Sequence, residues 1–177
     1  MPCVHITSGR LLNCKTAFSG VQAVSFKEYT GPLALGVDGS MTTYGATGSV
    51  YRFELKNDAC SYEEKAESNR QTGTTVVNGT LQIELPVLDK ATRDQIRLLS
   101  YGRPQIFVET FQGDVLLVGA EFGAECASIT LKTGGKKSDF SGFSLTFNTE
   151  ERNLVSWLGA TASTAYKAAV SATNVAP

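Results

Sequence analysis

Strict alternation of apolar and polar residues recurs along this chain and most strongly limits its fold. In SVYRFELK (residues 49–56), TLQIEL (residues 80–85) and FSLTFN (residues 143–148), every second residue is large and apolar. Successive side chains of a β-strand point to opposite faces, so this period of two predicts antiparallel strands with one buried and one polar face. We therefore expect a mainly β protein.

Further strands and one hairpin are also expected. Residues 22–29 (QAVSFKEY) and 126–132 (CASITLK) are strand candidates. PQIFVETF, QGD and VLLVGAEF, in that order, predict a hairpin closed by a short turn that contains glycine. In TTVVNGTLQI the pair Asn78-Gly79 is compatible either with a tight turn or with one long strand.

One helix is expected within this β-rich chain, over about residues 89–101. Asp89 is a good N-cap, and Gly102 and Pro104 end the helical pattern. An apolar stripe predicts that the helix packs on the side of a sheet, and its members are Leu88, Ile96 and Leu99.

Three polar or glycine-rich stretches are expected to form long loops, at about residues 30–49, 63–73 and 133–142. Loops of this length are uncommon inside a domain and are often functional. We expect one β domain over residues 1–158. Residues 159–177 are rich in Ala, Ser and Thr and are expected to form a C-terminal tail, because they offer little large apolar surface.

Composition narrows the classes of function. The chain has 177 residues, 42% of them hydrophobic, with 16 basic and 17 acidic residues. This balance argues against a general nucleic-acid binder, which normally carries a basic excess. No apolar run approaches the ~20 residues that cross a bilayer, and no secretory signal is recognisable, so we expect synthesis in a cytoplasm and no membrane contact.

Catalytic and metal-binding patterns are not recognisable, and we expect no enzyme activity, cofactor or metal. His5 is the single histidine, and the four cysteines lack a C-x-x-C pair. The stretch GGKKS (residues 134–138) fails the phosphate-loop pattern, since Thr130 occupies the first glycine position. The adjacent acids Glu63-Glu64 and Glu150-Glu151 would point to opposite faces of a strand. Trp157 is expected to be a packing anchor.

Several segments together resemble the tail-tube-like proteins of tailed bacteriophages, including the crAss-like phages of Bacteroidetes-type bacteria. They are TSGRLLNCKTAFSGVQAVSF (residues 7–26), YRFELKNDACSYEEK (residues 51–65), GTLQIELPVLDKATRDQIRLLSYGRPQIFVE (residues 79–109) and SGFSLTFNTEE (residues 141–151). The resemblance implies an antiparallel β-sandwich or barrel with one flanking helix. It also implies a virion protein of the phage tail that forms rings, commonly hexameric.

In that family the rings stack, or sit singly between head and tail, around a lumen that genomic DNA crosses. The resemblance thus implies as partners further copies of the chain, neighbouring tail or connector proteins, and DNA bound without sequence specificity. The candidate inter-subunit contacts are polar residues of the expected loops and helix, namely Glu63, Glu64, Arg93, Asp94, Arg97, Lys136 and Lys137. Two alternatives remain open, a tube protein of a contractile injection system and another binding module such as a carbohydrate-binding sandwich.

Overall fold

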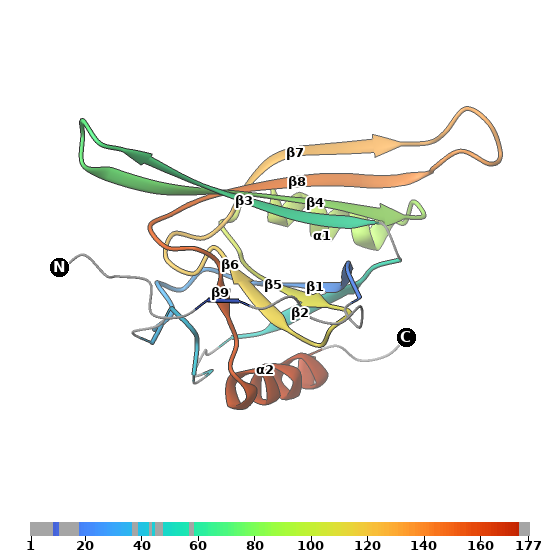
Figure 1. The fold of residues 1–177 in the computed structure, drawn as a ribbon. Helices are drawn as coiled ribbons and strands as arrows, with labels where there is room; N and C mark the ends of the chain where they lie inside the picture. Colours follow the sequence, from blue (N-terminus) through green and yellow to red (C-terminus); the bar gives the residue numbers. More distant parts are fainter. Residues whose placement is uncertain are drawn as a thin grey trace.

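A computed structural model describes residues 9–10, 18–36, 39–42, 44, 48–56 and 59–173. In this part of the chain, nine strands and two helices form three layers: a four-stranded sheet, a five-stranded sheet and a C-terminal helix (Figure 1). The elements are β1 Val21–Lys27, β2 Val50–Glu54, β3 Cys60–Asn69, β4 Thr74–Pro86, α1 Lys90–Leu99, β5 Gln105–Thr110, β6 Val115–Val118, β7 Glu125–Lys132, β8 Gly142–Glu151, β9 Ser156–Trp157 and α2 Ala160–Thr173.

Both sheets are antiparallel, with strand orders β2-β1-β5-β6-β9 and β3-β4-β8-β7. They pack face to face, so the mainly β fold with a flanking helix is confirmed. Of the two expected architectures it is the sandwich, because within the described residues neither sheet closes on itself into a barrel.

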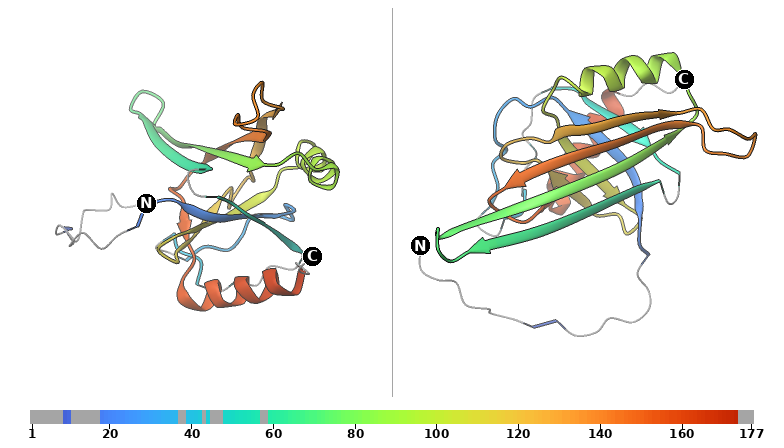
Figure 2. Two further views of the ribbon diagram at one scale, coloured as in Figure 1. Left: turned by 90° about the vertical axis from the view of Figure 1, so that its right-hand side faces the viewer. Right: turned by 90° about the horizontal axis from the view of Figure 1, so that it is seen from above.

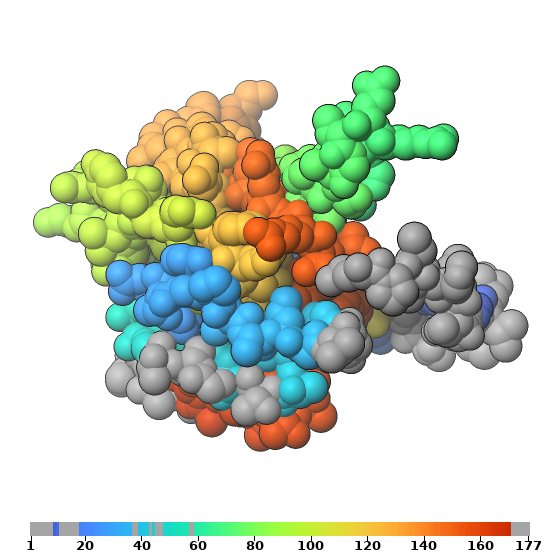
Figure 3. Space-filling view, turned by 90° about the vertical axis from the view of Figure 1, so that its left-hand side faces the viewer, coloured from blue at the N-terminus to red at the C-terminus, as the bar shows by residue number. Residues whose placement is uncertain are grey.

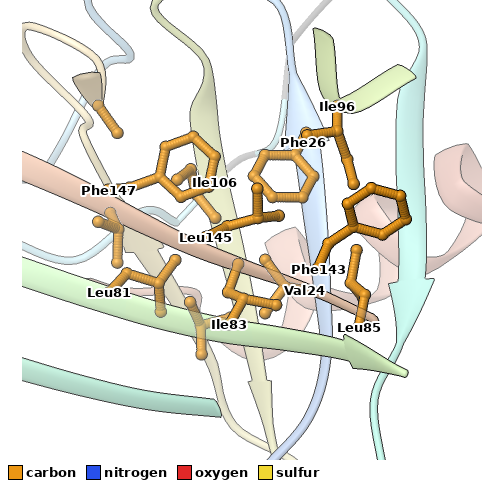
Figure 4. Packing of buried hydrophobic residues seen from close by; sticks show 13 residues of the cluster. Val24, Phe26, Leu81, Ile83, Leu85, Ile96, Ile106, Phe143, Leu145 and Phe147 are labelled. Atoms are coloured by element: carbon orange, nitrogen blue, oxygen red, sulfur yellow. The ribbon is translucent and has the colours of Figure 1, made fainter. Parts of the chain in front are cut away.

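The core between the sheets comes from the alternating apolar residues. Leu81, Ile83 and Leu85 of β4 pair with Phe147, Leu145 and Phe143 of β8, and all six side chains are buried. They meet Val24, Phe26 and Ile106 of the other sheet (Figure 4). Burying each large apolar side chain contributes roughly 1.5–3 kcal/mol. Asn78 and Gly79 lie inside β4, so the long-strand alternative is correct.

Helix α1 begins after Asp89, whose carboxylate accepts a hydrogen bond from the backbone N–H of Thr92 at 3.0 Å. Ile96 is buried in the core between the sheets, and Leu99 packs against the same core. The inclusion of Leu88 in the packing stripe was wrong. Leu88 precedes the N-cap Asp89, so it is not part of the helical stripe, and it stays 38% exposed.

Two segments that were expected to be irregular form a strand and a helix. The expected loop at 63–73 is wrong, because β3 extends to Asn69 and forms a long hairpin with β4. The expected C-terminal tail is wrong for residues 160–173, which form α2. Trp157 is also no packing anchor, since it is 52% exposed on the short edge strand β9. The expected loop at 133–142 corresponds to the connection between β7 and β8.

A buried polar network holds α2 against the five-stranded sheet. The Tyr166 hydroxyl lies 2.7 Å from the Ser25 hydroxyl and 2.9 Å from the Glu109 carboxylate. Arg52 donates to both oxygens of that carboxylate, at 3.2 and 3.1 Å. Tyr166 also stacks on Phe107, with ring centroids 4.8 Å apart. Burial is the main cause that raises the pKa of Tyr166, so the phenol remains a hydrogen-bond donor.

We predict that Tyr166→Phe lowers the free energy of unfolding by about 1.5–3 kcal/mol, because a buried carboxylate loses one donor while the ring packing is kept. Chemical denaturation measures the change. Tyr101→Phe is the matched control, since Tyr101 is 81% exposed. A loss below about 0.5 kcal/mol would contradict the role of the network, since it lies below the usual worth of a hydrogen bond to a charged group.

Candidate assembly surface of the four-stranded sheet

The outer face of the four-stranded sheet carries only polar side chains in its central cross-strand rows. It lies opposite the face that carries Leu81, Ile83, Leu145 and Phe147. Because side chains alternate along each strand, the register assigns to this outer face Ser61, Glu63 and Lys65 of β3, Asn78, Thr80, Gln82 and Glu84 of β4, Ser144, Thr146, Asn148 and Glu150 of β8, and Glu125, Ser128, Thr130 and Lys132 of β7.

The charges on this face are few and mostly negative. Four glutamates (63, 84, 125 and 150) stand against two lysines (65 and 132), a net charge of −2. Lys132 lies 4.0 Å from Glu84. The rows contain no Trp, Tyr or Phe among the residues just named. The face therefore offers neither the basic surface that holds nucleic acid nor the aromatic platform expected of a carbohydrate-binding sandwich.

Both edges of this sheet are open within the described part of the chain. β3 pairs only with β4, and β7 pairs only with β8. An unpaired edge strand presents free backbone N–H and C=O groups that can pair with another chain. On β7, Ile129 and Leu131 also face the sandwich interior yet are 39% and 51% exposed. The body of the protein thus leaves an apolar strip beside the β7 edge uncovered.

The sheet extends beyond the body at both ends. The β3–β4 hairpin projects at one end, and the β7–β8 connection projects at the other (Figure 1). Figure 3 shows this hairpin, in green, standing clear of the rest of the molecule. From above, the four long strands lie side by side with α1 along the β7 border (Figure 2). The β7–β8 connection is held by hydrogen bonds within itself. The Asp139 carboxylate accepts hydrogen bonds from the backbone N–H groups of Gly135 and Lys136.

The predicted inter-subunit contact residues fall in three separate places. Lys136 and Lys137 lie exposed in the β7–β8 connection. Arg93, Asp94 and Arg97 lie on the exposed side of α1, where the Arg93 and Asp94 side chains are 3.5 Å apart. The structure does not bring these two groups together.

The third place is β3, where the two glutamates face opposite sides of the sheet. Glu63 lies on the polar outer face. Glu64 lies on the inner face, where its carboxylate accepts the backbone N–H of Val155 at 2.8 Å and the Tyr62 hydroxyl at 3.3 Å. Glu64 therefore links the hairpin to the body of its own chain, and the prediction that it contacts another subunit lacks support from this geometry.

Glu151 makes a second link beneath the sheet. Its carboxylate accepts the backbone N–H groups of Glu121 and Phe122, each at 3.1 Å. Burial is the main cause that raises the pKa of Glu151, and the nearby carboxylates of Glu121 and Glu64 raise it further. This link between β8 and the β6–β7 connection was not predicted, because Glu121 and Glu151 are distant in sequence and carry no pattern that joins them.

No catalytic arrangement emerges among the described residues. His5, Cys3 and Cys14 lie outside them. Burial raises the pKa of the Cys60 thiol to about 12, which disfavours the reactive thiolate. Lys27 is buried, and its ammonium donates to Glu28, Thr30 and Gln105. No group of three acidic, His or Cys side chains in the described part could hold a metal ion.

Comparisons of the chain with protein-family models, with curated proteins and with solved structures found no match. The described helices include none that is long and apolar enough to span a membrane.

We predict that Glu151→Gln stabilises the protein increasingly as the pH rises from about 4.5. The raised pKa means that the folded state binds the Glu151 proton more tightly than the unfolded state. The wild-type carboxylate therefore lowers the free energy of unfolding as the pH rises through its folded-state pKa. Glutamine avoids this loss, and its amide oxygen can still accept the same backbone N–H groups.

Urea denaturation of both proteins between pH 4 and pH 8 measures the difference. Glu150→Gln, on the outward face of the same strand, is the matched control for removing a charge. A stability difference between Glu151→Gln and wild type that stays constant over this range would contradict the prediction.

Proposed function

We propose that this chain is a structural subunit that assembles side by side into rings around a channel, as a tail-tube or tail-connector ring protein of a tailed bacteriophage. The observation that carries the proposal is the four-stranded sheet, which combines a polar outer face with two open edges. The resemblance of residues 7–26, 51–65, 79–109 and 141–151 to tail-tube-like proteins supplies the biological setting.

Strand direction supports pairing between copies. Each neighbouring pair in the order β3-β4-β8-β7 is antiparallel, so the two edge strands run in opposite directions. A copy rotated about an axis along the channel would present its β3 antiparallel to β7 of its neighbour. Repetition of that contact gives a closed antiparallel barrel without edges, which removes the aggregation hazard of an open sheet.

The exposed apolar strip on β7 favours the same contact. Ile129 and Leu131 lie on the face of β7 that points toward the sandwich interior, and an adjoining subunit would cover them. A patch of this kind on an edge strand is typical of an interaction surface.

The polar outer face would line the channel. The net charge of −2 in its central rows would repel DNA phosphates, so that DNA passes without binding. DNA, further copies of the chain and neighbouring tail proteins are the partners in this proposal, and the tail of the virion is its location.

The purified full chain, concentrated and examined by negative-stain electron microscopy and sedimentation velocity, tests the proposal. We expect rings or short tubes. Ile129→Lys should yield folded monomers instead. A lysine on the side of an edge strand that faces the sandwich interior blocks pairing with another sheet. Thr130→Lys, on the outward face of the same strand, should still assemble. A wild-type protein that stays monomeric at high concentration would contradict the proposal.

A further inference from the structure

One strand of the four-stranded sheet is shorter than its neighbours, and this leaves a notch. β7 begins at Glu125, which pairs with Asn148 of β8. β8 continues through Thr149, Glu150 and Glu151, which pair with β4 but have no β7 partner. Along these residues the sheet therefore lacks one strand, a gap of about 4.8 Å.

The notch is an open cavity with a volume of about 540 Å³. Its lining includes Val76, Arg103, Phe122, Glu125, Glu150 and Arg152. The Arg152 guanidinium lies over the Phe122 ring, 5.6 Å from its centroid, and 3.8 Å from the Glu121 carboxylate. Arg103 lies 3.9 Å from Glu125. Phe122 and Arg152 thus line the notch, with further charged groups at its rim.

The β3–β4 hairpin has the length to reach such a notch on a neighbouring copy. Glu125, Asn148, Thr80 and Glu63 lie in one cross-strand row. β3 continues beyond that row through residues 64–69. If β3 of one copy pairs with β7 of the next, these residues run past the beginning of β7 and along the notch.

We propose that residues 65–69 of one copy occupy the notch of its neighbour, with Lys65 facing Glu150 and Glu67 facing Arg152. This contact rests on the proposed ring assembly. It adds a second contact between neighbouring copies to the pairing of β3 with β7. In this register Lys65 and Glu67 each lie opposite an unlike charge across the notch. The same register places Glu63 opposite Glu125, whose carboxylate lies 3.9 Å from Arg103 of its own chain.

Registers shifted by two residues place like charges opposite each other across the notch. A shift by two residues in one direction places Lys65 opposite Arg152, and a shift in the other direction places Glu67 opposite Glu150. A shift by one residue would turn the polar side of β3 toward the apolar interior. The long Lys and Arg side chains can span the width of the missing strand. The notch and the hairpin therefore fix how far one subunit slides along the next.

Cross-linking of mixed subunits tests the contact. Full chains whose native cysteines are replaced by alanine carry either Glu67→Cys or Arg152→Cys, and the two preparations are assembled together and treated with a short bismaleimide. We expect a cross-linked dimer in the mixture that neither preparation forms alone. Lys136→Cys, exposed at the opposite end of the sheet, replaces Glu67→Cys as the control and should not cross-link to position 152.

Electron microscopy of the same samples distinguishes a failure of the hairpin–notch contact from a failure of ring assembly. Rings without a cross-link above the Lys136→Cys control would overturn the contact and leave the ring assembly standing. Absence of rings in the wild-type protein would overturn both.

Charge reversal provides a second test with the native cysteines in place. Glu67→Arg and Arg152→Glu should each raise the concentration for half-assembly by roughly three- to tenfold, because each brings like charges together. The double variant should restore assembly to within about twofold of wild type. Thermal unfolding confirms that each variant is folded. A double variant whose defect equals the combined single defects would overturn the contact.

Discussion

The pairing between β4 and β8 is the constraint on which the rest of the structure depends. It runs in continuous register from Val77 opposite Glu151 to Pro86 opposite Gly142. This ladder places three apolar pairs toward the five-stranded sheet and leaves polar residues on the other face. A slip by one residue would exchange the two faces. The burial of these pairs therefore determines both the core and the polar surface.

The four-stranded sheet that is built on this pairing projects beyond the five-stranded sheet at both ends (Figure 1). At one end it supports the β3–β4 hairpin, which the Glu64 carboxylate ties to the body, while the Glu151 carboxylate ties the adjoining end of β8 to the β6–β7 connection. At the other end it supports the β7–β8 connection. A sheet with free edges, projecting ends and a polar outer face is exposed to pairing with other chains unless its edges are covered. Assembly into a ring covers them with the same strands of adjacent copies.

The predictable parts of this fold are those in which the apolar period is strong. β4 and β8 follow from alternation, the β5–β6 hairpin follows from two apolar runs around a turn that contains glycine, and Asp89 marks the start of α1. β3 was mistaken for a loop because its far half is polar on both faces, and its strand conformation depends on pairing with β4. Helix α2 was missed because its anchor is Tyr166, whose partners Ser25 and Glu109 are distant in sequence. The notch could not be predicted, since it arises from the unequal lengths of paired strands.

Hydrogen–deuterium exchange, compared between assembled particles and the Ile129→Lys variant, tests whether β3 and β7 of adjacent copies pair. We expect slower exchange after assembly for the amides of β3 and β7, because edge amides gain hydrogen-bond partners from the adjoining copy. The edges of the other sheet, β2 and β9, should exchange at the same rate in both samples. Unchanged exchange at β3 and β7, with new protection at β2, β9 or α2, would show that the copies do not join through the edges of the four-stranded sheet.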